Sequence, residues 1–355
     1  MTPSGPTTRP TISDALTLII TTSPTPSAPS TELLDTVFQS IRSYCGDLLA
    51  CRVILVLDTF ERVGEIARLK KGQVTEEGAA AYLRYKENVK DLVLGVYDQL
   101  DNKDELLQEQ GEAEYGYSGR ASSVTTNLAV YTVSRTKDGR VSFVEPSERL
   151  GFGLAVRTAL RITTTPYVWI HQHDWTIVYE IPVAPILDVM QTNDADKEGP
   201  VKYICLPSVR MLQYAETAHV KDFPRLRALT DKLKHDFVPQ SCPTVKIPLT
   251  PMFFWHDKPH IASTQHYLSR VFPTRLAIPR GAFIEDTVGH RARTQMKEEG
   301  MWSRWGCWMF YPGQGKQLCL RHLNGRRWRG AEAESNLRES YRQAHIEAKA
   351  RDVDD

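Results

Sequence analysis

The chain has 355 residues, a formal net charge of +1, 41% hydrophobic residues and 25% charged residues. This composition excludes a wholly disordered or fibrous chain, and the length suits two ordinary domains or one enlarged α/β domain. The near-zero net charge disfavours a protein that holds nucleic acid by bulk electrostatics, so we find no strong nucleic-acid signal.

The first part of the chain alternates buried strands with a helix. Residues 1–13 are rich in Pro, Thr and Ser and are interpreted as a flexible leader. Continuous apolar runs predict strands at 16–20 and 53–57, the second ending at Asp58, and apolar residues at helical spacing predict a helix over 32–44. Strand, helix and strand in this order are typical of a doubly wound parallel sheet.

The next segment departs from this pattern. Residues 61–135 are largely polar, with helical periodicity over 76–107 and a Gly- and Ser-rich loop over 111–123. We interpret 61–135 as a largely helical insertion.

Alternation of strands and helices resumes after this segment. Apolar runs predict strands at 141–144, 167–170 and 201–206, and helical spacing predicts helices at 150–162 and 182–190. Residues 207–250 indicate a mostly helical, basic region. Residues 331–355 predict a charged tail that is a solvated helix or disordered.

Membrane and redox signals are weak throughout the chain. No apolar run approaches the roughly 20 residues that span a bilayer, and the first residues lack the apolar core of a signal peptide. The six cysteines show no CxxC pair and no zinc-finger spacing, which indicates reduced thiols. We therefore expect a cytoplasmic protein without a membrane span.

Polar residues follow the predicted strand at 167–170 in the order His171-Gln172-His173-Asp174. Ligands of open parallel sheets bind beyond the carboxyl ends of the strands, and a carboxylate such as Asp174 suits Mg²⁺ or Mn²⁺. The alternative is a polar strand end whose histidines are only hydrogen-bonded.

Adjacent carboxylates, Glu285 and Asp286, lie in the sequence GAFIEDTVGH before a predicted helix. One of them could accept a proton from an attacking hydroxyl. The alternative is an acid that caps the start of the helix.

Residues 251–260 offer another loop with an acid, Asp257, among aromatic residues.

Two further motifs have both a functional and a structural explanation. Gly151 and Gly153 match the first two glycines of a dinucleotide-binding GxGxxG motif, but Val156 occupies the place of the third glycine. The alternative is that the two glycines permit tight packing of a helix on a strand. Aromatic and basic residues at 302–308 and 322–329 could stack bases or sugars and hold phosphates, or form a structural cluster beside a solvated basic loop.

In chain order these motifs resemble the nucleotide-sugar glycosyltransferases of the GT-A fold, most closely family two. LIITTSPTPSAPSTELLDTVFQSI resembles the opening strand, loop and helix, and VILVLD the second strand with its acid. LGFGLAVRTALRITTTPYVWIHQHDW is similar to the helix and strand that lead to the metal-binding DxD, FIEDTVGH to the catalytic-acid motif, and RHLNG supplies a later histidine. The resemblance covers residues 15–60 and 140–325. It implies an α/β fold with a Rossmann-like, mostly parallel sheet flanked by helices, in a single catalytic domain over 14–330.

The resemblance also implies roles for individual residues. Thr22 and Asp58 would lie near the base and ribose of the donor, and Arg157 near its ribose or diphosphate. Gln172 and His173 fall on the DxD, with Gln172 at the position of the first acid. Asp174 and His322 would hold a divalent cation, Mn²⁺ or Mg²⁺, that offsets charge on the departing diphosphate. Asp286 would be the general base, with Glu285 beside it, in one in-line displacement that inverts the anomeric carbon.

The resemblance leaves the substrates open. A UDP-sugar is the favoured donor, and the acceptor is a protein, a glycan or a small molecule. One alternative is a catalytically inactive relative that binds a nucleotide sugar without turnover. The other is a nicotinamide-dependent oxidoreductase built on Gly151 and Gly153.

Overall fold

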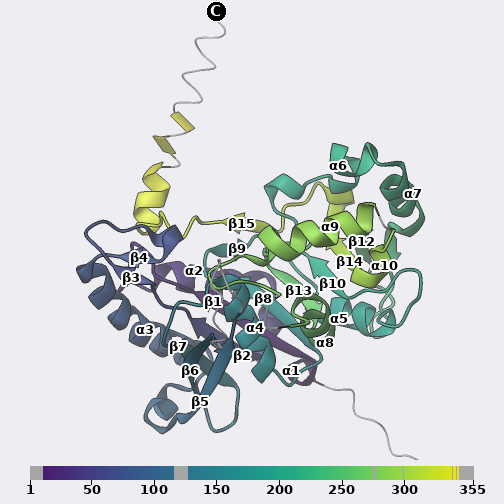
Figure 1. Cartoon of the computed structure of the whole chain (residues 1–355). Helices are drawn as coiled ribbons and strands as arrows, with labels where there is room; N and C mark the ends of the chain where they lie inside the picture. Colours follow the sequence, from purple (N-terminus) through teal and green to yellow (C-terminus); the bar gives the residue numbers. More distant parts are fainter. Residues whose placement is uncertain are drawn as a thin grey trace, which may run out of the picture.

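A computed structural model describes residues 11–115, 127–274, 277–298, 300–337, 339–340 and 342–343. Its centre is a sheet of eleven strands in the order β11-β12-β14-β10-β13-β8-β1-β2-β7-β6-β5 (Figure 1). The strands of this sheet are β1 (Leu16–Thr22), β2 (Arg52–Leu57), β5 (Leu107–Glu114), β6 (Leu128–Arg135), β7 (Val141–Pro146), β8 (Tyr167–Gln172), β10 (Tyr203–Cys205), β11 (His235–Phe237), β12 (Ile247–Pro251), β13 (His260–Ser263) and β14 (Cys307–Phe310). Two small ribbons pair β3 (Arg62–Val63) with β4 (Gln73–Val74), and β9 (Trp175–Ile177) with β15 (Leu320–His322).

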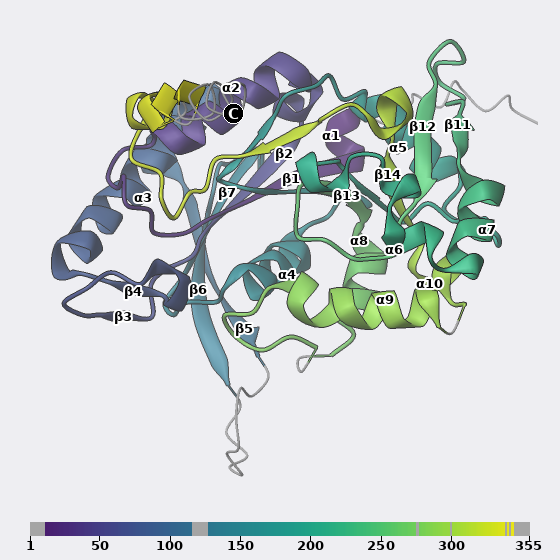
Figure 2. The same cartoon turned by 90° about the horizontal axis from the view of Figure 1, so that it is seen from above.

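The sheet has a parallel centre. Strands β8, β1, β2 and β7 are parallel neighbours, and only β6, β12 and β13 run against the other eight strands. The sequence prediction of an α/β fold with a mostly parallel sheet is therefore confirmed. The crossovers from β1 to β2 and from β7 to β8 move in opposite directions along the sheet. Because such crossovers are right-handed, they place α2 and α4 on opposite faces (Figure 2).

Ten α-helices are present in the described part of the chain. They are α1 (Ile12–Ala15), α2 (Glu32–Tyr44), α3 (Glu76–Val96), α4 (Phe152–Ile162), α5 (Val183–Thr192), α6 (Ala218–Lys221), α7 (Pro224–Leu233), α8 (Thr264–His266), α9 (His290–Lys297) and α10 (Trp302–Trp305). None of these described helices has the length and apolarity that crossing a bilayer requires.

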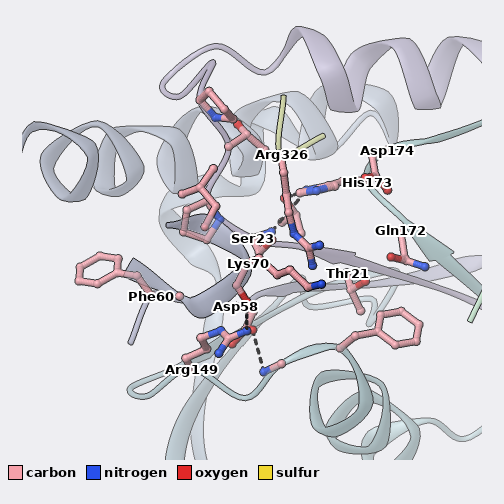
Figure 3. A pocket seen from close by; sticks show the side chains of 18 of the residues that line it. Thr21, Ser23, Asp58, Phe60, Lys70, Arg149, Gln172, His173, Asp174 and Arg326 are labelled. Carbon is pink, nitrogen blue, oxygen red and sulfur yellow. Dashed lines mark hydrogen bonds between the residues drawn. The ribbon is translucent and has the colours of Figure 1, made fainter. Parts of the chain in front are cut away.

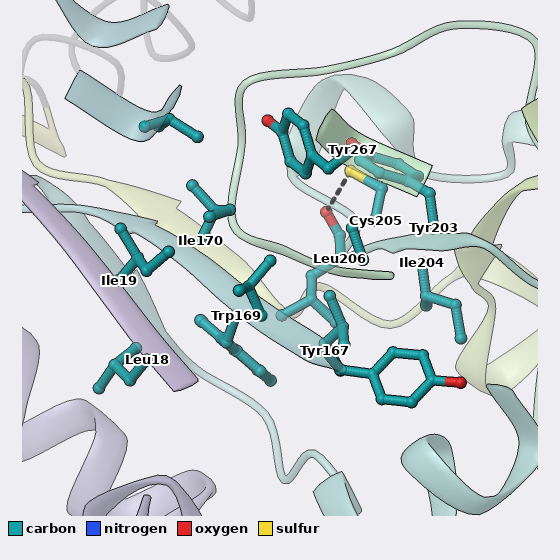
Figure 4. Close-up of a cluster of buried hydrophobic side chains, with 14 of the residues drawn as sticks. Leu18, Ile19, Tyr167, Trp169, Ile170, Tyr203, Ile204, Cys205, Leu206 and Tyr267 are labelled. Atoms are coloured by element: carbon teal, nitrogen blue, oxygen red, sulfur yellow. Dashed lines mark hydrogen bonds between the residues drawn. The ribbon is translucent and has the colours of Figure 1, made fainter. Parts of the chain in front are cut away.

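The core follows from the apolar runs of the central strands. All seven residues of β1 are buried, because helices cover both faces of a parallel sheet. Leu18 pairs with Trp169 and Ile19 with Ile170 across β1 and β8, and this layer continues to β10 and Tyr267 (Figure 4). The three tryptophans at 302, 305 and 308 are also buried, which favours the structural explanation of that aromatic cluster.

The structure corrects two segment predictions. The segment 61–135 contains α3, but it also contains β5 and β6, an antiparallel hairpin at the edge of the main sheet. β5 is mostly polar and exposed, so it carries no apolar signal of its own. Residues 207–250 were predicted to be mostly helical, yet they include β11 and most of β12, which pair with each other. Residues 1–10 of the predicted leader, 116–123 of the predicted loop, and 338, 341 and 344–355 of the predicted tail lie outside the described residues.

Candidate functional site

A cleft of about 1280 Å³ opens at the carboxyl ends of β1, β2 and β8. Parallel strands that end at one edge of a sheet bring their following residues together, so this is where ligands of open α/β sheets bind. The predicted site residues that line the cleft are Thr22, Asp58, Gln172, His173, Asp174, Glu285 and His322. Arg157 and Asp286 are not among the lining residues.

His173 is fixed at the base of the cleft by the end of β1. Its Nδ1 lies 2.6 Å from Thr22 Oγ1, and the backbone N–H of Ser23 donates to the same nitrogen over 3.4 Å. Thr22 Oγ1 also lies 3.0 Å from the hydroxyl of Tyr85 on α3. Burial lowers the pKa of His173. Since Nδ1 accepts a hydrogen bond, the neutral ring carries its proton on Nε2 and can donate it.

Asp58 lies at the end of β2 and lines the cleft, but backbone groups occupy its carboxylate. Oδ1 accepts from the N–H groups of Leu150 (2.7 Å) and Thr59 (3.0 Å), and Oδ2 accepts from Gly151 (2.9 Å). Burial raises the pKa of Asp58 to about 6, although these three hydrogen bonds favour the charged form. The carboxylate therefore holds the start of α4 against β2. A nucleotide that contacts Asp58 would bind the same carboxylate oxygens that accept these backbone hydrogen bonds.

Asp174 and His322 meet although 148 residues separate them in sequence. His322 Nε2 lies 3.1 Å from Asp174 Oδ2, which also accepts from the Gly325 N–H over 3.0 Å. Burial alone would raise the pKa of Asp174, but the His322 hydrogen bond and the nearby imidazoles lower it to about 2. The His322 ring packs against Trp175, with 4.6 Å between ring centroids.

This pair offers two ligands to a cation. Asp174 Oδ1 is buried and has no hydrogen-bond partner in the described structure. Carboxylate oxygen and imidazole nitrogen both suit Mn²⁺. Within the described ranges no group of three or more His, Cys, Asp and Glu side chains is placed to hold a metal ion. The pair therefore fits a cation whose remaining ligands come from a bound phosphate and water.

Gln172 links β8 to the loop that follows β12. Its Nε2 donates to the backbone carbonyl of Asp257 over 2.8 Å. Its amide therefore holds the loop that carries Asp257 against the strand end.

Glu285 and Asp257 form a carboxyl pair in the lining of the same cleft. The backbone N–H of Asp257 donates to Glu285 Oε2 over 3.3 Å, and the Glu285 N–H donates to Asp257 Oδ2 over 3.2 Å. Glu285 Oε2 also lies 3.4 Å from His256 Nδ1, and this contact lowers the pKa of Glu285 to about 2. Burial and the adjacent Glu285 charge raise the pKa of Asp257 well above its usual range. The environment of the pair thus favours the ionised form of Glu285 and disfavours ionisation of Asp257. The sequence places Asp257 in a loop among aromatic residues, but no sequence pattern links it with Glu285.

Two predicted site residues, Arg157 and Asp286, do not line the cleft. Glu285 and Asp286 are consecutive on a helical turn, where side chains project in different directions, so Glu285 lines the cleft and Asp286 is exposed. Arg157 is buried in α4, and its guanidinium donates to the carbonyl of Glu114 on β5 over 2.7 Å. The structure therefore does not bring these two side chains into the cleft with the other predicted site residues.

The two glycines of the partial dinucleotide motif have a packing role. Gly151 has φ +77°, and a Cβ there would lie 2.4 Å from the Cα of Gly281. A Cβ on Gly153 would lie 2.2 Å from Ile278 Cδ1. The glycines therefore let α4 approach the 278–282 segment, which explains them without a dinucleotide.

Cationic side chains outnumber acidic ones in the lining of the cleft. Eight Lys and Arg residues face the cleft: Arg68, Lys70, Lys71, Arg149, Lys258, Arg326, Arg327 and Arg329. In the described part of the chain, none of these eight is within ion-pair distance of an acidic side chain. Figure 3 shows Lys70 and Arg326, from segments far apart in sequence, both directed into the cavity. The site is thus built to receive a strongly anionic ligand.

Comparison with known proteins gives weak matches only. No protein-family model and no curated protein matches the sequence. Among solved structures, the mannosyltransferase PcManGT from Pyrobaculum calidifontis, in complex with GDP-Man and Mn²⁺, is 15% identical over 88% of this chain, with a TM-score of 0.36. Residues 1–349 of TarS from S. aureus are 10% identical over 86% of the chain, with a TM-score of 0.37. Glucosyl-3-phosphoglycerate synthase from Mycobacterium tuberculosis, with Mn²⁺, UDP and phosphoglyceric acid, is 11% identical over 73%, with a TM-score of 0.27.

The chain spans 60% or less of the length of these solved structures. With TM-scores below 0.5, the likeness carries no argument about activity. The proposed function therefore rests on the geometry of the cleft.

Proposed function

We propose that this protein is a glycosyltransferase that moves a sugar from a nucleoside-diphosphate sugar to an acceptor hydroxyl. One observation carries the proposal: a single cleft at the strand ends holds the Asp174–His322 pair, the ionised Glu285 and a cationic lining. A diphosphate leaving group needs positive charge, and an acceptor hydroxyl needs a base on the other side of the reacting carbon.

The donor half of the site lies along β1, β2 and β8. Thr22 and Asp58 border the proposed position of the nucleoside, for which we favour uridine. His173 Nε2–H, Lys70 and Arg149 are our candidates for contacts to the diphosphate. Asp174 and His322 would hold Mn²⁺ or Mg²⁺, which when bound offsets negative charge on the departing diphosphate.

Glu285 takes the role of general base in place of Asp286. Its carboxylate accepts the acceptor proton while the acceptor oxygen forms a bond to the anomeric carbon and the bond to the diphosphate breaks. Because this is a single displacement from the opposite side, the product has inverted anomeric configuration. His256 and the Asp257 N–H hold the carboxylate in position.

The test compares Glu285→Gln with the neighbouring control Asp286→Asn. General-base catalysis is typically worth about 10²–10⁴-fold, so Glu285→Gln should lower kcat by that factor with little change in donor affinity. Asp286→Asn should keep near wild-type turnover. The rate of transfer is measured from the nucleoside diphosphate that is released. The anomeric configuration of the product is assigned by proton NMR. A larger loss of kcat in Asp286→Asn than in Glu285→Gln would identify Asp286 as the general base. A product that retains the anomeric configuration of the donor would contradict a single displacement.

The two alternatives give different results in the same experiments. An inactive relative would bind UDP-sugars and hydrolyse or transfer none of them. A nicotinamide-dependent oxidoreductase would show a thermal shift with NAD or NADP and none with nucleoside diphosphates and Mn²⁺.

A further inference from the structure

We propose, on the basis of the function above, that the acceptor carries a phosphate group, which Lys258 and Arg326 bind beside Glu285. The first support is the charge of the cleft. Eight cationic side chains line it against four acidic ones (Asp58, Asp174, Asp257 and Glu285), whereas the whole chain has 44 cationic and 43 acidic side chains. The positive excess of the cleft is therefore a local feature of this surface.

The donor does not account for this excess. A nucleotide sugar brings only the charge of its diphosphate, and a cation at Asp174 and His322 would offset much of it. The excess persists when all four acidic lining residues are counted as charged, and burial and Glu285 disfavour ionisation of Asp257 because they raise its pKa. Cationic side chains without acidic partners remain available for a second anion.

Lys258 is fixed close to the proposed base. It follows Asp257, whose N–H donates to Glu285, and its Nζ lies 3.4 Å from His256 Nδ1, the imidazole nitrogen that contacts Glu285. The Lys258 charge also contributes to lowering the pKa of Glu285. An anion bound by Lys258 would therefore lie within reach of the carboxylate that activates the acceptor hydroxyl.

Arg326 belongs to the C-terminal segment and lies near the residues that precede Glu285. Its guanidinium carbon lies 5.6 Å from the centroid of the Phe283 ring, two residues before Glu285. The preceding residue, Gly325, is anchored by its N–H to Asp174. These contacts place Arg326 between Asp174 and the segment that carries Glu285, and Figure 3 shows its side chain directed into the cavity. A guanidinium can bind a phosphate through two parallel hydrogen bonds, which favours phosphate recognition.

The experiment uses acceptor pairs that differ only in a phosphate group. Wild-type protein is assayed with UDP-sugars and Mn²⁺ on glycerol against glycerol 3-phosphate, and on glucose against glucose 6-phosphate. We expect kcat/KM to be at least about tenfold higher for the phosphorylated member of one pair. Lys258→Met and Arg326→Met should each reduce that ratio toward one. The matched control Lys246→Met removes an exposed lysine outside the cleft and should keep the ratio. Equal use of both members, or an unchanged ratio in both variants, would overturn the proposal.

Direct binding separates failure of this inference from failure of the proposed function. Calorimetry measures binding of glycerol 3-phosphate and of glycerol to protein saturated with UDP and Mn²⁺, and to protein alone. If no donor is turned over, the glycosyltransferase proposal fails, and the phosphate site is then judged by binding. Tighter binding of glycerol 3-phosphate that both variants weaken supports the site. Binding no tighter than that of glycerol, or binding that neither variant changes, refutes it.

Discussion

Gly325 is the point at which the C-terminal segment is attached to the cleft, and Gly325→Ala tests that attachment. An added Cβ would lie 2.9 Å from Asp174 Cβ and 3.0 Å from both Asp174 Oδ2 and His173 Nε2. Both neighbours are buried and hydrogen-bonded, so the segment at Gly325 has to move rather than the neighbours. That movement breaks the hydrogen bond from the Gly325 N–H to the Asp174 carboxylate.

A hydrogen bond to a charged group contributes about 1.5–3 kcal/mol, and we expect Gly325→Ala to lower the free energy of unfolding by that amount. Urea unfolding followed by fluorescence and circular dichroism measures it. The matched control is Gly46→Ala, where an added Cβ meets nothing within 4 Å; such surface changes usually stay within about 0.5 kcal/mol. A Gly325→Ala variant as stable as Gly46→Ala would refute the attachment of this segment through Asp174.

Three further predictions follow from contacts in and behind the cleft. Gly151→Ala should destabilise the protein by more than about 1 kcal/mol in urea unfolding, because the glycine has φ +77° and its Cβ would collide with Gly281; a stable variant would contradict the packing role of Gly151. The raised pKa of Asp257 means that its folded form binds a proton more tightly than its unfolded form, so its stabilising contribution is present below about pH 4 and is lost as pH rises through the folded pKa. Asp257→Asn should therefore flatten the fall in unfolding free energy as pH rises above about 4, whereas parallel curves for variant and wild type would show an ordinary carboxyl. Removal of divalent cations with EDTA should weaken UDP binding in calorimetry, and Asp174→Asn should make UDP binding insensitive to EDTA; equal sensitivity would exclude Asp174 as a ligand.

The local patterns of the sequence were sufficient for the centre of the fold. The apolar runs that became β1, β2 and β8 predict strands without any tertiary information, because strands buried on both faces must be continuously apolar. Their order along the chain predicts a parallel sheet, and a parallel sheet gathers Thr22, Asp58 and Asp174 at one edge. The edge strand β5 was not predicted because its residues are mostly polar and give no apolar pattern. It is recognised as a strand only through its pairing with β6.

The sequence by itself thus determined the parallel centre of the sheet and the edge at which polar residues collect. Only the tertiary structure decided which of those residues face one another. The family resemblance pairs His322 with Asp174, but no local pattern encodes their contact, and the structure brings the two side chains together across 148 residues. Glu285 and Asp286 are neighbours on a helical turn, yet Glu285 lines the cleft and Asp286 is exposed. The physical reason is that periodicity reports which residues are buried within an element, whereas a site depends on side-chain directions and on contacts between elements far apart in the chain.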